Sequence, residues 1–401
     1  MSDDLTIYLD NHATTRVDPR VLAAMLPYFS EHFGNAGSVV HAYGERAREA
    51  VADSRRAIAA AIGASPEEIV FTSGATESNN LAIRGVAERQ RRRGDHLVSV
   101  ATEHRAVLDP LARLGRRGYD VTLLDVAPHG RREAGLVDVE QFAAALRDDT
   151  VLASVMLANN EIGVVQPIAE LAAACRAAGV LLHCDATQAV GKLPVDVQEL
   201  GVDLMSFSAH KIYGPKGVGA LYVRRTRPAV RLDAQISGGG QEHGLRSGTL
   251  NVPGIVGLAA AVSLCQLELS DEMSRQTKLR NRLWQRLSAG VAGVELCGPA
   301  LDAVDAAGTP LRLPGNLDVA FGDVDGEALM LAMPDVAVSS GAACSSTDPA
   351  PSHVLLALGM TEDAARSTLR FGLGRFTTES DVEMAADAVI AAVAKLRGLA
   401  R

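Results

Sequence analysis

Lys211 stands where a lysine could react covalently with an aldehyde. It follows an apolar run within "SFSAHKIYGPKGVG" (206–219), just before a turn rich in Gly and Pro. A lysine that is desolvated enough to lose its proton can form a Schiff base with an aldehyde. The neighbouring Ser208 and His210 could ligate a phosphate group. Without further evidence, an ordinary surface lysine after a strand is more common than a reactive one. Other residues must therefore show whether Lys211 binds an aldehyde.

Asp185 is the second residue that could do chemistry. It ends the apolar run that starts at residue 180, where a carboxylate is costly unless it meets a cation or a hydrogen-bond donor. A protonated pyridine nitrogen would be such a partner, and this pairing makes the ring of pyridoxal phosphate (PLP) a better electron sink. From local sequence alone, a helix N-cap ahead of "ATQAVGK" explains Asp185 equally well.

A phosphate site is indicated by "TSGATESNN" (72–80), which places Gly74, Ala75 and Thr76 at a predicted helix start. Free backbone N–H groups and the positive end of the helix dipole favour a phosphate there. The alternative is an ordinary helix N-terminus that Thr76 or Ser78 caps.

Two more side chains could contact a cofactor or a substrate. His104 lies between a predicted strand and a helix, where a neutral imidazole could stack on a heteroaromatic ring and exchange protons. Local hydrogen bonds would also satisfy it. Arg370 lies in the strand-like run "STLRFGLGRF", and a guanidinium can grip a carboxylate with two hydrogen bonds. An internal ion pair with Asp or Glu is the alternative for Arg370 and for Arg375.

Cys344 differs from the other four cysteines in its surroundings. It lies among Ser, Gly and Ala in "SSGAACSST" (339–347), where nothing could enclose the thiol in apolar packing. Cys175, Cys184 and Cys265 lie in apolar periodic segments and are predicted to be inert core residues. Cys297 precedes a Gly-Pro turn and could be of either kind.

Seven short apolar runs alternate with helical patterns in the first part of the chain. The runs cover residues 68–74, 96–104, 119–126, 150–160, 180–188, 203–211 and 218–225, and helical spacing covers 77–92, 105–118, 139–149 and 168–179. This alternation predicts an α/β fold with a mostly parallel sheet that helices cover on both faces. Because ligands of such sheets bind outside the carboxyl ends of the strands, the polar clusters there should converge on one site.

A long helical pattern at about 253–289 is predicted to lead out of this large domain. Beyond a loop at 297–316, short runs and a final Ala-rich helix suggest a small α+β domain. We therefore assign residues 16–260 to a large cofactor-binding domain. Residues 1–15 and 261–401 are assigned to a small domain that carries the Cys344 loop.

The composition excludes several classes of protein. The net charge of −9 argues against nucleic-acid binding, and the basic cluster 88–96 is interpreted as a solvated helix C-terminus that ends at Gly94. No signal peptide is recognisable, and no window approaches 18 unbroken apolar residues, so we expect no membrane span. Five scattered cysteines without Cys-x-x-Cys spacing oppose a disulfide framework and a zinc site, and predict a cytoplasmic protein with reduced thiols.

Taken together, the chain resembles the cysteine desulfurases, PLP-dependent enzymes of the class V branch of the aspartate-aminotransferase fold. Nine ordered blocks carry the resemblance almost from end to end. They are "YLDNHATTRVDP", "FTSGATESNN", "TEHRAVLD", "NNEIGVVQP", "DATQAVGK", "SFSAHKIYGPKG", "RSGTLNV", "SSGAACSS" and "LRFGLGRFT". The group it is most similar to has its catalytic cysteine in a long Ser-Ser-Gly-x-Ala-Cys loop.

The resemblance implies a role for each matching residue. Lys211 would hold PLP as an internal aldimine and move the substrate Cα proton, with Asp185 on the pyridine nitrogen, His104 stacked on the ring and Gln188 near the phenolic oxygen. The residues that would bind the phosphate are Ala75, Thr76, Ser208, His210 and, from the partner subunit of a homodimer, Thr249. Asn160 would contact the cofactor and, with Arg370, hold the substrate carboxylate.

Cys344 would then be the nucleophile that takes sulfur from L-cysteine as a persulfide, leaving L-alanine. A sulfur-acceptor protein, either an iron–sulfur scaffold or a relay for tRNA or cofactor thiolation, would receive it. The resemblance implies no resident metal, although Cys344 could transiently ligate an iron–sulfur cluster with a scaffold. Deprotonation of Cys344 by His104 is a further hypothesis. Some relatives continue past "KLRGLAR" into a scaffold-docking tail, so that docking mode is not expected here.

Three alternatives stay open at this point. Two are enzymes of the same fold, a selenocysteine lyase and a small-amino-acid aminotransferase. The third is a non-catalytic PLP-binding or sulfur-carrier protein, which the intact set of Lys211, Asp185, His104 and Cys344 opposes.

Overall fold

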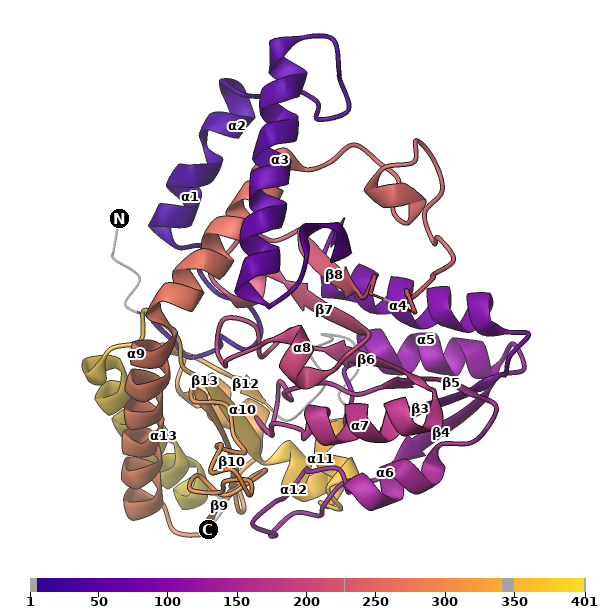
Figure 1. Cartoon of the computed structure of the whole chain (residues 1–401). Helices are drawn as coiled ribbons and strands as arrows, with labels where there is room; N and C mark the ends of the chain where they lie inside the picture. Colours follow the sequence, from indigo (N-terminus) through magenta and orange to yellow (C-terminus); the bar gives the residue numbers. More distant parts are fainter. Residues whose placement is uncertain (1–5, 227, 341–349, 400–401) are drawn as a thin grey trace.

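The computed structural model describes residues 6–226, 228–340 and 350–399 of the chain (Figure 1). Its largest sheet has seven strands in the order β2-β8-β7-β6-β5-β3-β4. The strands are β2 (Ile69–Thr72), β8 (Gly219–Val223), β7 (Leu204–Ser208), β6 (Leu181–Asp185), β5 (Thr150–Ser154), β3 (His96–Val100) and β4 (Asp120–Leu124). Among these strands, β8 alone is antiparallel to its neighbours, which are β2 and β7. The predicted mostly parallel α/β sheet is therefore confirmed.

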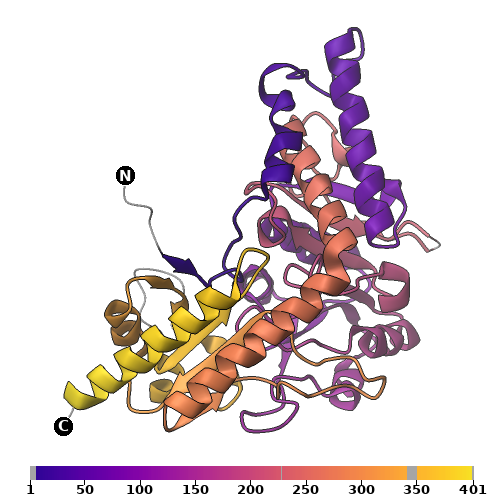
Figure 2. The same cartoon turned by 90° about the vertical axis from the view of Figure 1, so that its left-hand side faces the viewer.

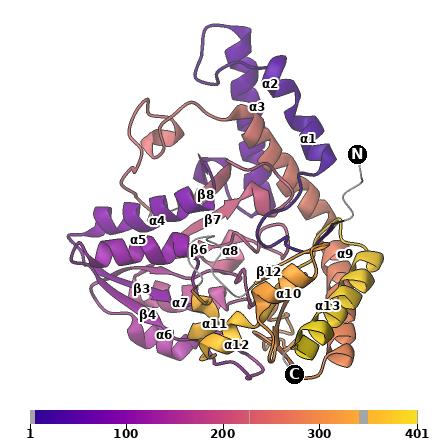
Figure 3. The ribbon, with the colours of Figure 1, turned by 180° about the vertical axis from the view of Figure 1, so that it is seen from behind.

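Helices cover both faces of this sheet because successive strand residues point to opposite faces. On one face, Val70 and Leu97 pack with Leu81 and Leu111 of α4 (Ala75–Gln90) and α5 (Arg105–Gly115). On the other face, Phe71 and Val98 belong to a larger core. That larger core includes residues of α3 (Ala42–Ala61), α6 (Val139–Ala145), α7 (Ile168–Ala178) and α8 (Val197–Leu200). Figure 3 shows α4 and α5 side by side over their face.

The basic cluster at 88–96 is structural, although its predicted end is wrong. Helix α4 ends at Gln90 and not at Gly94. Arg91 donates to Gly118 O and lies over the Tyr119 ring, and Arg93 donates to Gly179 O. These carbonyls follow the C-terminal ends of α5 and α7, where a cation offsets the negative end of a helix dipole.

A second core belongs to the smaller sheet, whose order is β12-β13-β10-β9. Its strands are β9 (Val294–Leu296), β10 (Asn316–Phe321), β12 (Ser339–Ser340) and β13 (Thr368–Gly372), and all their pairs are antiparallel. The helices in this part of the chain are α10 (Gly326–Ala332), α11 (His353–Ala357), α12 (Glu362–Arg366) and α13 (Glu379–Leu399). Near the start of the described residues, β1 (Ile7–Tyr8) pairs with β11 (Val336–Ala337), and Ile7 and Val336 both belong to this second core.

The 39-residue helix α9 (Val252–Gly290) joins the two cores, and Figure 2 shows it running from one to the other. Leu258 and Val262 pack in the core of the large sheet, whereas Leu283 and Leu287 pack in the second core. The predicted boundary at residue 260 falls inside this helix, and the division into domains stays a prediction. Helices α1 (Pro19–Met25) and α2 (Pro27–Ser30) pack against its first half.

Helix α9 is also, among the described residues, the one helix long and apolar enough to cross a membrane by length and composition. Within its most apolar 18-residue window, 56% is buried inside the protein, which is what a helix shared by two cores requires. The expectation that no segment spans a membrane stays a prediction.

Candidate active site

A cavity of about 610 Å³ opens at the carboxyl ends of the strands of the large sheet. Ten of the residues singled out from the sequence line it together: Ala75, Thr76, His104, Asn160, Asp185, Gln188, Ser208, His210, Lys211 and Arg370. Asp185 and Ser208 end β6 and β7, Arg370 lies in β13, and the others lie in segments that follow β2, β3, β5, β6 and β7. The structure thus brings the polar strand ends to one place, as the topology of an open α/β sheet predicts.

Lys211 is held against the N-terminal segment of the chain. It ends a single 3-10 turn (Ala209–Lys211) that follows β7 directly. Its Nζ donates hydrogen bonds to the backbone oxygens of His12 and Ala13, each at 2.6 Å. The amine therefore has a defined place on the cavity wall, close to both the strand end and residues 12–14.

Asp185 is buried at the end of β6 with both carboxylate oxygens engaged. Oδ2 accepts a hydrogen bond from Asn79 Nδ2 at 2.6 Å, and Oδ1 accepts one from Thr187 N at 2.9 Å. The second bond closes a turn, but no helix begins there, since the next helix, α8, starts at Val197. The N-cap alternative for Asp185 is therefore wrong. Each carboxylate oxygen keeps a second lone pair for a ligand.

The start of α4, where the sequence predicts an anion site, has an N-terminus without a side-chain cap. Gly74, at the N-cap position, has no side-chain cap bond, and this leaves the N–H groups of the first turn available. Ser78 does not cap the helix, since its Oγ pairs with Thr72 Oγ1 at 2.8 Å. Gly219 at the start of β8 must lack a side chain, because a Cβ there would lie 2.7 Å from Gly74 Cα.

His104 caps α5 through its ring. Its Nδ1 accepts a hydrogen bond from Ala106 N at 3.0 Å. Burial, the largest effect, lowers the pKa of His104, so the ring is neutral and carries its proton on Nε2. In this form the exposed nitrogen donates a hydrogen bond. Proton acceptance by His104, as hypothesised for Cys344, would first require a different tautomer.

Arg370 lines the cavity and also forms an internal ion pair with Asp10, which was the alternative hypothesis for this residue. Its Nη2 donates to Asp10 Oδ1 and to Ser339 Oγ, each at 2.8 Å, and its Nη1 donates to Asn160 O at 3.0 Å. Arg375 pairs with Asp18 and Glu268, away from the cavity lining.

Comparisons with known proteins place this arrangement in a family. Residues 7–384 match the family described as aminotransferase class-V. The chain is 56% identical over 394 residues to a cysteine desulfurase IscS of Anaeromyxobacter sp. (strain Fw109-5), covering 98% of this chain and 94% of that protein. This chain belongs to the class-V aminotransferases, among the cysteine desulfurases.

Other relatives agree with this placement. A cysteine desulfurase IscS of Klebsiella pneumoniae subsp. pneumoniae is 51% identical over 397 residues, again covering 98% of this chain and 94% of the relative. Among solved structures, a NifS-like protein superposes with a TM-score of 0.86 at 36% identity, covering 97% of this chain and 99% of the other. A structure titled SspA in complex with cysteine gives a TM-score of 0.78 at 35% identity, covering 93% and 100%.

Two residues predicted for this desulfurase site are not among the described cavity residues. Thr249 is exposed and does not line the cavity of its own chain. Cys344 lies outside the described residues. The described segment before it ends at Ser340, in β12, and its neighbour Ser339 pairs with Arg370, which lines the cavity.

Sequence reasoning missed several side chains of the desulfurase cavity. His12, Asn79 and Thr187 all line it, and each has a buried polar atom without a hydrogen-bond partner in the described part of the chain. Arg370 Nε is a fourth such atom. Because buried polar atoms are costly when unpaired, their gathering here fits a polar ligand such as PLP. The polar cluster "DNHATT" after the first apolar run was the available signal for His12.

Replacing Asp185 with asparagine should lower the desulfurase activity by about 10²–10³-fold. Asparagine keeps the hydrogen bond from Thr187 but removes the charge that would pair with a protonated ring nitrogen. Alanine release from L-cysteine, measured at saturating PLP, tests this. Asp203→Asn, at an ion pair with Arg224 at the other end of the sheet, is the control. Equal activities of the two variants would contradict the role of Asp185.

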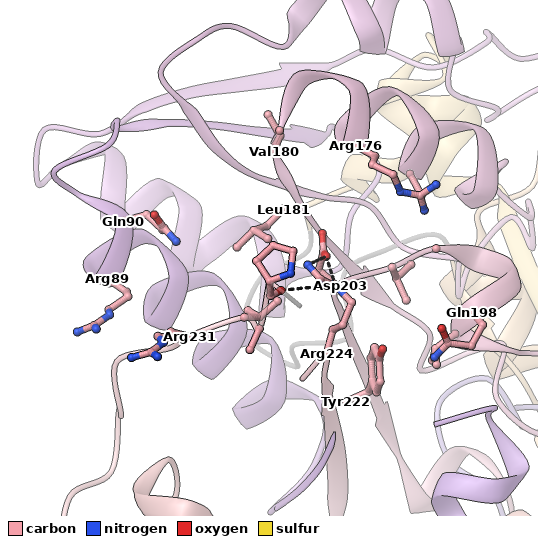
Figure 4. A pocket seen from close by; sticks show the side chains of 18 of the residues that line it. Arg89, Gln90, Arg176, Val180, Leu181, Gln198, Asp203, Tyr222, Arg224 and Arg231 are labelled. Carbon is pink, nitrogen blue, oxygen red and sulfur yellow. Dashed lines mark hydrogen bonds and ion pairs between the residues drawn. The ribbon is translucent and has the colours of Figure 1, made fainter. Parts of the chain in front are cut away.

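A second cavity, of about 730 Å³, lies at the opposite end of the large sheet (Figure 4). It is lined by Leu181 and Asp203 at the strand starts and by five arginines: Arg89, Arg93, Arg176, Arg224 and Arg231. Arg224 is already paired with Asp203 at 2.6 Å. No residue predicted to act in the reaction lies there, so its size does not make it the active site.

Proposed function

We propose that this enzyme uses PLP, bound in the 610 Å³ cavity, to convert L-cysteine to L-alanine. The substrate C–S bond breaks, a new S–S bond forms to Cys344, and the thiol of Cys344 becomes a persulfide. The alanine Cβ gains the proton that balances the reaction. PLP, when bound, supplies an electron sink next to the substrate Cα.

The observation that carries this proposal is the convergence of three groups on one cavity. The Lys211 amine supports covalent attachment of an aldehyde, the Asp185 carboxylate supports a protonated ring nitrogen, and the start of α4 supports a phosphate. Gln188 is assigned to the phenolic oxygen, and Ser208 and His210 to the phosphate. Burial, the largest effect, lowers the pKa of His210 to about 4, so it would serve as a neutral ligand.

The remaining groups are assigned to the substrate and to sulfur transfer. Asn160 and Arg370 would hold the carboxylate of L-cysteine, and His104 would stack on the PLP ring. Cys344 would deliver its persulfide sulfur to an acceptor protein, for which an iron–sulfur scaffold is our first candidate. The protein would act in the cytoplasm.

The enzyme is further proposed to work as a homodimer, with Thr249 of one subunit reaching the phosphate site of the other. An exposed apolar surface supports this arrangement. It comprises Leu22, Leu26, Phe29, Phe33, Val39, Val40 and Tyr43 of the segment from α1 to α3, each at least 47% exposed. Clustered apolar surface of this kind is typical of subunit interfaces.

The proposed attachment of PLP can be tested by reduction with borohydride followed by peptide mapping. We expect one pyridoxyl group per chain, on the peptide that contains Lys211. Modification of another lysine, or none, would refute the assignment of the cofactor site.

A further inference from the structure

His12, Gln188 and Lys192 form a buried hydrogen-bonded chain on one side of the cavity. Lys192 Nζ donates to Gln188 Oε1 at 2.7 Å, and His12 Nδ1 lies 3.1 Å from the same oxygen. Gln188 Nε2 donates to the backbone oxygen of His12 at 2.9 Å. His12 and Gln188 both line the cavity and are almost fully buried.

The hydrogen-bond partners of Gln188 determine the orientation of its side-chain amide. The two ends of an amide have the same shape, so the neighbours must decide which is oxygen. Burial lowers the pKa of Lys192 to about 7, so the orientation rests on the backbone oxygen of His12, which can only accept. The end that faces Lys192 must therefore be Oε1, and the end that faces the His12 carbonyl must be Nε2.

The orientation of the Gln188 amide in turn determines the tautomer of His12. Since Gln188 Oε1 can only accept, the hydrogen bond at 3.1 Å requires a proton on His12 Nδ1. Burial and the charge of Lys192, in that order, lower the pKa of His12 well below its ordinary value. The ring is therefore neutral, and its Nε2 carries a bare lone pair. Within the described residues this buried nitrogen has no hydrogen-bond partner.

We propose that His12 is an additional substrate-binding residue, whose Nε2 accepts a hydrogen bond from an N–H or S–H group of the bound amino acid. The proposal rests on the function proposed above. The low basicity of His12 means that it accepts this bond without removing the proton. His104 cannot take this part in its present tautomer, because its outward nitrogen is a donor.

Toward His12, Lys192 and Gln188 are positioning residues, in addition to the contact with PLP proposed for Gln188. The backbone oxygen of His12 also accepts the hydrogen bond from Lys211 Nζ, so the same residue touches the proposed PLP lysine. A substrate held at Lys211 would thus lie beside His12.

The first test is nitrogen NMR of the histidine-labelled apoprotein, with the His12→Asn variant used to assign the signal. We expect a neutral ring at pH 7 with its proton on Nδ1. A proton on Nε2, or an imidazolium, would overturn the proposal. This measurement needs no cofactor, so its result tests the tautomer of His12 whether or not the protein binds PLP. Failure to bind PLP would instead refute the proposed function.

The second test compares His12→Phe with His12→Asn in the holoenzyme. Phenylalanine keeps a ring but has no acceptor, and should raise KM for L-cysteine by about tenfold with a smaller change in kcat. Asparagine can donate to Gln188 Oε1 and still offer an oxygen, so its KM should stay within about twofold of the wild type. Both variants should bind PLP as the wild type does.

Equal KM values for wild type and His12→Phe would refute the proposal, and so would equal impairment of both variants. If His12→Phe does not fold, His12→Ala replaces it in the same comparison. Titration with L-alanine, which has the ammonium but no thiol, identifies the donor. Weaker binding of both amino acids to the variant points to the ammonium, and weaker binding of L-cysteine alone points to the thiol.

Discussion

Replacement of Lys211 by alanine should lower alanine formation from L-cysteine by roughly 10³-fold or more. The variant loses the amine that would hold the PLP aldehyde and move the substrate Cα proton. Lys192 lies behind Gln188, whereas Lys216, which also lines the cavity, follows a separate turn. The measurement is the initial rate of alanine release with PLP in excess, together with the visible absorbance of the protein.

Lys278→Ala is the matched control for this experiment, since Lys278 is an exposed lysine of α9 far along the chain from the site. It should retain full activity and full cofactor content. An active Lys211→Ala variant would contradict the account even if its PLP content were reduced.

Replacement of Cys344 by serine should abolish persulfide formation, a fall of at least roughly 10³-fold in sulfur transfer. The other four cysteines are buried and cannot substitute for it. Burial raises the pKa of Cys175 to about 12 and that of Cys265 to about 11, and it raises the pKa of Cys184 and Cys297 well above the ordinary value. Cys297, which the sequence left open, is therefore a core residue.

Cys175→Ala is the control for the cysteine experiment. Cys175 is a buried residue of α7, and burial raises the pKa of its thiol to about 12, so it does not form a thiolate at neutral pH. Its sulfur transfer should equal that of the wild type. Cys344→Ser should still bind PLP and perform slow half-transamination, which would separate a desulfurase from an aminotransferase. Undiminished sulfur transfer by Cys344→Ser would exclude the proposed nucleophile.

The sheet and most of the cavity could be predicted because their signals are local. Each strand is a short apolar run, and Asp185 and Ser208 directly end two of them. Once the alternation with helices indicates a parallel sheet, the strand ends must share one edge. Their convergence then follows without knowledge of any long-range contact.

The remaining parts depend on contacts between distant positions. His12 meets Gln188 across 176 positions, and Arg370 meets Asp10 across 360. Neither partner carries a pattern that names the other, so the tautomer of His12 and the ion pair of Arg370 required coordinates. The end of α4 was misplaced for a related reason. Arg91 and Arg93 bind carbonyls of other elements instead of continuing the helix.

Sulfur should pass from L-cysteine to Cys344 at the cavity proposed for PLP. The most direct test of this transfer is mass spectrometry of the holoenzyme after a single turnover with L-cysteine, with alanine quantified in the same sample. We predict one added sulfur atom on the peptide that contains Cys344 and an equal amount of L-alanine. Alanine without added sulfur on that peptide, or sulfur on any other cysteine, would contradict the account.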